Sequence, residues 1–174
     1  TDSNNETVKL LLNHPNIDIN KQNNDGWTAL MMACRYSNID SNIETVKLLL
    51  NHPNIDINKQ DKEGYTALML ACEYSNIETV KLLLNHPNID VNKQNNEGYT
   101  ALMLSGKNYK TVKLLLNYPN IDINKQTNNG QNALFEFCKF SLREKNLKLL
   151  LNRPDTKINY QDNHGNTALM IACK

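Results

Sequence analysis

Cysteine and histidine are the residues of this sequence best suited to hold a metal ion, and both recur at regular intervals. The residues in question are Cys34, Cys72, Cys138 and Cys173, together with His14, His52 and His86. A zinc site needs its ligand atoms about 2.0–2.3 Å from one ion, whereas equivalent positions of stacked helices lie about 8–10 Å apart. A disulfide needs Cα atoms within about 7 Å of each other. We therefore predict no metal site, buried and reduced cysteines, and histidines that are solvated or cap loops.

Signatures of catalysis are missing from the sequence as well. It contains no Gly-x-Ser-x-Gly elbow and no glycine-rich phosphate loop, and we expect no cysteine to be exposed in an electropositive setting. Residues that recur in every copy of a motif are better explained by folding than by a single active site. The sequence therefore predicts a protein that is not an enzyme and that uses no cofactor.

The elements that position these residues come from one segment that is repeated along the chain. Residues 51–72 (NHPNIDINKQDKEGYTALMLAC) return with small changes at 14–34, 86–105 and 118–138, and more divergently at 153–173. The glycines at positions 26, 64, 98, 130 and 165 follow one another at intervals of 38, 34, 32 and 35 residues. Repetition at this period is typical of proteins in which each unit packs only on its neighbours.

Each repeat predicts two short helices. Leu68, Ala71 and Cys72 have the spacing i, i+3 and i+4, which places them on one face of a first helix. Residues 77–84 (IETVKLLL) carry a similar apolar stripe and predict a second helix. A proline after each second helix, such as Pro87, ends it because proline cannot donate a backbone hydrogen bond.

The ends of these helices are marked by capping residues. A threonine before the first helix can accept a hydrogen bond from the free N–H groups of the first turn, and the expected N-caps are Thr28, Thr66, Thr100 and Thr167. Ser75 and Glu78 predict a capping box for a second helix. The turn-rich residues 57–64 predict a short hairpin-like finger, in which Gly64 adopts a positive φ.

Residues 61–71 (DKEGYTALMLA) resemble the ankyrin repeat, whose usual phrase is T-P-L-H-x-A. The resemblance covers the whole chain and implies an all-α ankyrin-repeat solenoid of stacked helix-turn-helix units with short β-hairpin fingers. It implies one array of about 4.5 repeats that spans residues 1–174. The expected parts are a partial repeat 1–22, repeats of about 23–60, 61–94, 95–126 and 127–161, and a partial repeat 162–174. Since both ends carry interior-type sequence, we expect a fragment of a longer array.

One departure from the family pattern changes the expected interior. The usual histidine, which forms hydrogen bonds across repeats in the family, is replaced at Met31, Met69, Met103, Phe135 and Met170. We therefore expect an apolar seam along the first helices.

Composition limits the classes of partner. The formal net charge is +1, which argues against a general binder of nucleic acid or of acidic membranes. No apolar run approaches the roughly 20 residues needed to cross a bilayer, and no signal peptide is recognisable. We therefore expect an intracellular, cytoplasmic monomer that binds neither nucleic acid nor membrane.

The resemblance implies protein–protein recognition through a concave face built from finger tips and first helices. Residues that bind a partner should vary between copies while the frame stays constant, and large aromatic rings are favoured at interfaces. The predicted partner-binding residues follow the glycines (Trp27, Tyr65, Tyr99, Gln131), lie late in the first helices (Arg35, Tyr36, Glu73, Tyr74, Lys107, Lys139), or occupy finger tips (Asp25, Lys62, Glu63, Glu97). Alternatively, each ring packs only on its own finger.

Two further hypotheses stay open. The chain could be an architectural spacer or adaptor segment of a larger multidomain protein, and its repeats are similar in style to those of large DNA viruses or amoebal eukaryotes. Residues 84–92 (LNHPNIDVN) also resemble the target context of asparaginyl hydroxylases that act on ankyrin domains. The corresponding hydroxylation candidates are Asn20, Asn58, Asn92 and Asn124, which are alternatively required for the backbone hydrogen bonds of the fingers.

Overall fold

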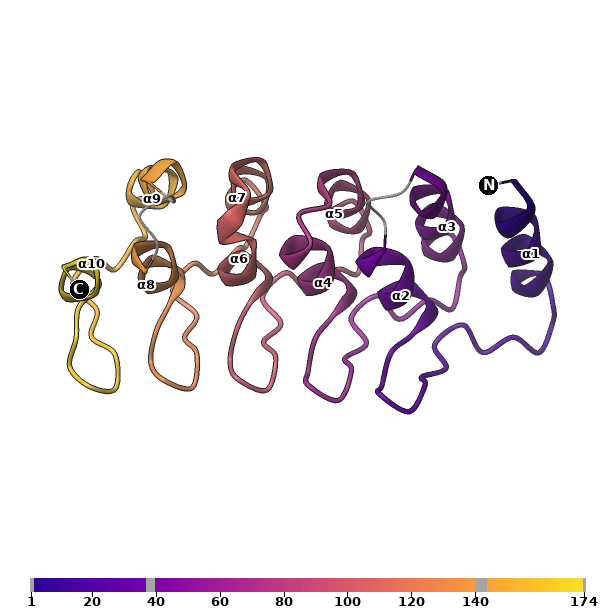
Figure 1. Ribbon diagram of the computed structural model, residues 1–174, viewed down its shortest axis with the longest axis horizontal. Coiled ribbons are helices and arrows are strands. Elements are labelled where there is room, and N and C mark those ends of the chain that lie inside the picture. Colours follow the sequence, from indigo (N-terminus) through magenta and orange to yellow (C-terminus); the bar gives the residue numbers. More distant parts are fainter. Residues whose placement is uncertain (1, 37–39, 140–143, 174) are drawn as a thin grey trace. The chain divides into compact units, whose positions relative to one another are not determined.

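Short helices alternate with finger-shaped loops in the computed structural model, which describes residues 2–36, 40–139 and 144–173 (Figure 1). The chain divides into two compact units, Thr1–Asp90 (unit 1) and Val91–Lys174 (unit 2). None of the helices in the described ranges has the length and hydrophobicity needed to cross a bilayer.

Unit 1 contains first helices that precede a turn and second helices that follow it. Its helices are α1 (Asp2–Leu12), α2 (Ala29–Arg35), α3 (Asp40–Leu50), α4 (Ala67–Glu73) and α5 (Ile77–Leu84). The first helices α2 and α4 pack on each other, and each packs on the second helix that follows it. The second helices α1, α3 and α5 form a parallel row in Figure 1, farther from the fingers.

Unit 2 repeats this arrangement with shorter first helices. Its elements are α6 (Ala101–Leu104) with the 3₁₀ helix η1 (Ser105–Lys107), α7 (Tyr109–Leu116), α8 (Ala133–Cys138), α9 (Glu144–Leu151) and α10 (Ala168–Ala172). Helix α8 packs on α6, α9 and α10, and α7 packs on α9.

The apolar seam predicted along the first helices is present at four of five positions. Met31, Met69, Met103 and Phe135 are buried, whereas Met170 is 52% exposed. Without the usual histidine, the Met31 sulfur accepts a hydrogen bond from the Thr28 backbone N–H at 3.4 Å. The prediction was wrong for Met170 because α10 packs only on α8 among the elements described.

The cysteine prediction is correct in part. All four cysteines are free thiols, but only Cys34 and Cys72 are buried, while Cys138 is half-buried and Cys173 is exposed. Cys34 and Cys72 lie inside their helices, whereas Cys138 is the last residue of α8 and Cys173 follows the last residue of α10. Burial raises the pKa of the Cys34 and Cys72 thiols, which keeps them protonated.

The predicted threonine N-caps are confirmed at Thr28, Thr66, Thr100 and Thr167. The capping box at Ser75 was wrong. Ser75 adopts a left-handed conformation with φ of 60°, so Asn76 is the extended residue that precedes α5. The Asn76 side chain accepts a hydrogen bond from the Thr79 N–H at 3.1 Å.

The fingers are tight turns rather than paired strands. In the first finger, Asn23 N–H donates to the Trp27 carbonyl oxygen and Gly26 N–H donates to the Asn23 carbonyl oxygen, both at 3.0 Å. The finger glycines have positive φ as predicted, for example 81° at Gly64. An isolated bridge between Gln161 and Thr167 is the extent of β-pairing in the described residues.

Neighbouring fingers are joined through their tips within each unit. Lys62 N–H donates to the Asp25 carbonyl oxygen at 3.3 Å in unit 1, and Asn128 N–H donates to the Glu97 carbonyl oxygen at 2.9 Å in unit 2. The finger tips are therefore fixed relative to their neighbours while their side chains remain exposed.

Candidate functional site

Six of the nine residues predicted to bind a partner in unit 1 line one surface depression, which we call the aromatic hollow, whereas Asp25, Tyr36 and Lys62 lie outside its lining. Its volume is about 190 Å³. Both fingers and both first helices of unit 1 contribute to its lining: Trp27, Arg35, Asp61, Glu63, Tyr65, Leu70, Glu73 and Tyr74. Of these residues, Leu70 was not predicted.

Turn geometry positions the two finger aromatics of the hollow. The Asn23 side-chain oxygen accepts a hydrogen bond from the Trp27 N–H at 2.8 Å. The Asp61 carboxylate accepts one from the Tyr65 N–H at 2.7 Å. Because the first residue of each finger binds the residue after the glycine, the aromatic side chain emerges at a fixed place.

Arg35, the last residue of α2, lies among three aromatic rings. Its guanidinium carbon is 5.0 Å from the Trp27 ring centroid, 5.2 Å from that of Tyr74 and 5.8 Å from that of Tyr36. These distances are within the range of cation–π contacts. Within the described part of the chain, the Arg35 guanidinium has ring contacts but no hydrogen bond or ion pair.

Negative charge surrounds the remainder of the aromatic hollow. Burial raises the pKa of Asp61; hydrogen bonds from the Tyr65 and Glu63 N–H groups oppose this shift, and the negative charge of Glu63 adds to it. Glu73 stands in α4 at the position that Arg35 occupies in α2. The hollow therefore carries three carboxyl groups and one guanidinium.

In unit 2 the predicted residues form a different, more polar group. Tyr99 is half-buried, and its pKa is raised by burial, by the charges of Glu136 and Glu97, and by a hydrogen bond with Glu136. Glu136 is only 7% exposed and pairs with Lys139 at 2.6 Å. Tyr99 and Lys139 are therefore joined through a residue that the sequence reasoning missed.

A sequence signal for Glu136 did exist. Its position within the first helices is otherwise occupied by apolar residues, namely Met32, Leu70, Leu104 and Ile171. A single carboxylate at such a position needs a partner when it is buried, and Tyr99 and Lys139 supply one.

The other residues predicted in unit 2 are more dispersed. Gln131 donates through its side-chain amide to the Asp162 carboxylate at 3.1 Å. Lys107 is exposed at the end of η1, and the Glu97 side chain is exposed at its finger tip.

Comparison with known proteins decides the family. The family profile described as "Ankyrin repeats (3 copies)" matches residues 1–61, 39–127 and 105–174. The chain belongs to the ankyrin repeat family. Its predicted fold class is thereby confirmed: the fold is that of ankyrin repeats, helical throughout the described residues apart from turns and loops.

A solved ankyrin structure is similar over nearly the whole chain. The crystal structure of EF0377, an ankyrin repeat protein, shares 27% sequence identity at a TM-score of 0.84, and the match covers 99% of this chain and 86% of that one. No curated protein matches the chain. Ankyrin repeats are generally protein–protein interaction modules, and the family is generally non-enzymatic.

The ankyrin hydroxylation candidates form hydrogen bonds that join successive repeats. The Asn58 side-chain amide donates to the Asn88 carbonyl oxygen at 2.6 Å, and its oxygen accepts from the Asp90 N–H at 2.8 Å. Asn20 makes the equivalent pair of bonds in unit 1. The expected backbone role of these asparagines is present, and their hydroxylation stays a prediction.

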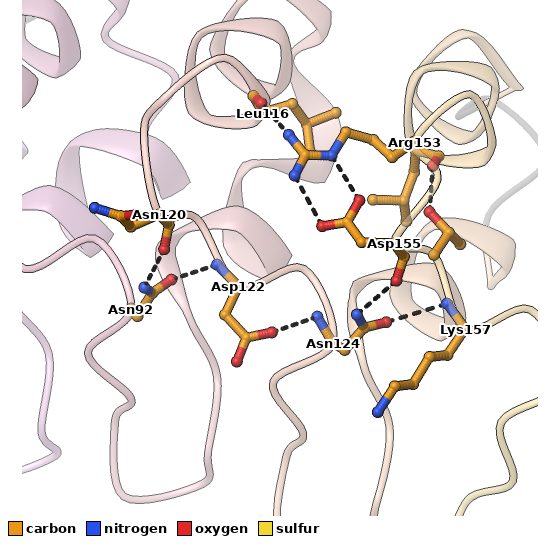
Figure 2. A network of polar contacts seen from close by, with 10 residues as sticks. Asn92, Leu116, Asn120, Asp122, Asn124, Arg153, Asp155 and Lys157 are labelled. Atoms are coloured by element: carbon orange, nitrogen blue, oxygen red, sulfur yellow. Dashed lines mark hydrogen bonds and ion pairs between the residues drawn. The ribbon is translucent and has the colours of Figure 1, made fainter.

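Figure 2 shows that asparagine side chains join successive repeats in the same way in unit 2. Asn92 joins Asn120 and Asp122, and Asn124 joins Asp155 and Lys157, through one donated and one accepted bond each. Arg153 adds a bidentate pair with Asp155 at 2.8 and 2.9 Å and a bond to the Leu116 carbonyl oxygen at 2.7 Å.

The histidines of the ankyrin repeats cap loops, as predicted. His14, His52 and His86 each accept a hydrogen bond through Nδ1 from the N–H two residues later, at 3.2 to 3.3 Å. No group of three or more potential metal ligands comes together in the described ranges.

Proposed function

We propose that this chain is a non-catalytic protein–protein interaction module that binds a partner through its finger tips and first helices. The observation that carries the proposal is the grouping of Trp27, Arg35 and Tyr74 around one depression. Tyr36 and Tyr74 are 50% and 45% exposed. Exposed aromatic side chains beside an arginine have the composition of interface hot spots.

The residues that are constant between repeats can be separated by their roles from those that vary, and the variable residues are the ones we expect to contact a partner. Asn58 and the finger glycines serve the repeat frame, since Asn58 joins one repeat to the next and the glycines adopt the positive φ of the finger turns. Within the aromatic hollow, Trp27, Arg35 and Glu73 differ from the residues at the equivalent positions of the other repeats. A cytoplasmic location and a monomeric state belong to the same proposal, and light scattering on the purified chain tests the latter.

The experiment is a selection of ligands from a displayed library of random peptides, with the purified chain as bait. Under the proposal, alanine substitution of Trp27, Tyr65 and Tyr74 together lowers the affinity of selected ligands at least tenfold. The matched control is Tyr109→Ala, because Tyr109 is a comparably exposed ring at the start of α7. A second variant, Tyr99→Ala, measures how much the corresponding ring of unit 2 contributes to the affinity for the selected ligands.

An architectural spacer within a larger protein is the alternative. It predicts that no selected ligand depends on the aromatic hollow more than on Tyr109. Equal affinities of the triple variant and the unsubstituted chain would therefore reject recognition through this face.

A further inference from the structure

We propose that the aromatic hollow of unit 1 binds a cationic side chain, lysine or arginine, presented by an extended segment of a partner protein. This inference rests on the proposed function and specifies the chemistry of the partner. It follows from the charges, rings and size of the hollow.

The aromatic hollow carries an excess of negative charge. Asp61, Glu63 and Glu73 line the hollow against a single cation, Arg35. The Asp61 carboxylate is engaged by two backbone N–H groups of its own turn. The carboxylates of Glu63 and Glu73 form no hydrogen bond or ion pair with any residue that the structure describes, so both are available to a ligand.

Aromatic rings line the same hollow. Arg35 shows that the rings of Trp27 and Tyr74 can hold a guanidinium, since its carbon lies 5.0 and 5.2 Å from their centroids. A ring face attracts cations through its quadrupole. A second cation that enters beside Tyr65 therefore meets ring surface as well as the two carboxylates.

The size of the hollow limits what can enter it. A depression of about 190 Å³ that opens to solvent accommodates one side chain rather than a helix or a folded element. Residues of two fingers and two first helices line the hollow, and the remaining residues of an extended partner segment would lie across these elements. Specificity then comes from the single residue that enters the hollow.

An anionic ligand fits less well. It could pair with the unused N–H groups of Arg35, but it would also approach three carboxyl groups. Like charges brought together at an interface are unfavourable. The two signs of ligand charge therefore give opposite predictions for substitution of Arg35.

The direct test uses Trp27, which is the single tryptophan of the chain, as the fluorescent reporter. Four heptapeptides, Ac-Gly-Ser-Gly-X-Gly-Ser-Gly-amide with arginine, lysine, citrulline or glutamate as X, are titrated into the full chain. We expect saturable binding of the arginine and lysine peptides, at least tenfold tighter than that of the citrulline peptide. No saturable binding of either basic peptide, or equal binding of citrulline, overturns the inference.

Substitutions locate the site. Combined Glu63→Gln and Glu73→Gln should remove the tenfold preference for the basic peptides, whereas Glu97→Gln, at the equivalent finger tip of unit 2, should retain it. Arg35→Met should strengthen binding of the arginine peptide severalfold, because it removes a like charge and uncovers ring surface. If the unsubstituted chain binds the glutamate peptide more tightly than the basic peptides, and Arg35→Met loses that binding, the hollow is assigned to an anionic partner instead.

The displayed library separates this inference from the proposed function. Some selected ligands could lose affinity for Trp27→Ala, show no enrichment of lysine or arginine, and bind the double glutamine variant as well as the unsubstituted chain. Such ligands would support the proposed function and overturn the inference of a cationic partner. Ligands indifferent to the triple alanine variant of Trp27, Tyr65 and Tyr74 would reject both.

Discussion

The guanidinium carbon of Arg35 lies 5.0 Å from the centroid of the Trp27 ring. This contact joins the end of α2 to the finger that precedes it, and Tyr74 of the next repeat covers the same guanidinium at 5.2 Å. Arg35 thus links two successive repeats through aromatic surfaces, on the face where variable residues gather.

Replacement of Arg35 by alanine is expected to expose the Trp27 ring and shift its emission to longer wavelengths. The free energy of unfolding should fall by about 0.5–1 kcal/mol, as for a partly exposed cation–π contact. Fluorescence spectra and urea denaturation measure the two effects. Lys47→Met, an exposed lysine on α3, is the control, and an identical shift in that variant would show that the Arg35 contact is not its cause.

A second prediction concerns the asparagine that joins repeats. Asn58→Ala removes a donor to the Asn88 carbonyl oxygen and an acceptor for the Asp90 N–H. Because these backbone groups are exposed and water can replace the lost partner, each bond should contribute about 0.5–1.5 kcal/mol. Chemical denaturation should show this loss.

Asn88→Ala is the matched control for this experiment. Its backbone carbonyl, which accepts the bond from Asn58, is retained, and its side chain is exposed. A comparable loss of stability in both variants would contradict the bridging role of Asn58.

The finger glycines allow the cost of backbone conformation to be separated from the cost of close packing. Gly98 and Gly165 have φ of 84° and 77°. A Cβ atom at Gly98 would lie 2.7 Å from the Thr127 Cα, whereas the nearest atom to a Cβ at Gly165 would be 4.0 Å away.

Gly165→Ala should therefore cost only the left-handed conformation, about 1–2 kcal/mol. Gly98→Ala should cost more, since the next finger must also move. Thermal unfolding of the two variants tests this difference. Equal melting temperatures would mean that the finger of residues 127–130 shifts to accommodate the added Cβ atom without a loss of stability.

Much of this architecture is readable from local sequence rules. The threonine caps and the positive φ of the finger glycines depend on residues within one turn, so the repeated phrase was sufficient to predict them. Ser75 and Asn76 are both good capping residues, and the choice between them depends on the left-handed turn between α4 and α5, which no pattern in the sequence specifies.

The sequence predicted which residues belong to the candidate site better than it predicted how their side chains contact one another. Variation between repeats identified Trp27, Arg35 and Tyr74, but their stacking depends on how α2 and α4 are offset in space. Glu136 was missed because its contact with Tyr99 appears only when the finger and the next first helix are brought together, although its ion pair with Lys139 is local, at i,i+3.

The last prediction compares two aspartates that hold the same place in different fingers. Burial alone would raise the pKa of Asp162, but hydrogen bonds from Gln131, Asn166 and His164 lower it to about 2. For Asp61, burial and the charge of Glu63 outweigh the hydrogen bonds and raise the pKa. An aspartate in an unfolded chain has a pKa of about 3.9.

These opposite shifts give opposite dependences of stability on pH. The ionised Asp162 stabilises the fold above about pH 3.9, and this contribution is lost as the pH falls through about 2. The stability of the unsubstituted chain relative to Asp162→Asn should therefore decrease from pH 5 to pH 2. Relative to Asp61→Asn it should increase as the pH falls, because protonation relieves the cost of a buried charge. Urea denaturation at a series of pH values measures both differences, and parallel pH curves for the three proteins would contradict the assigned environments of both carboxyl groups.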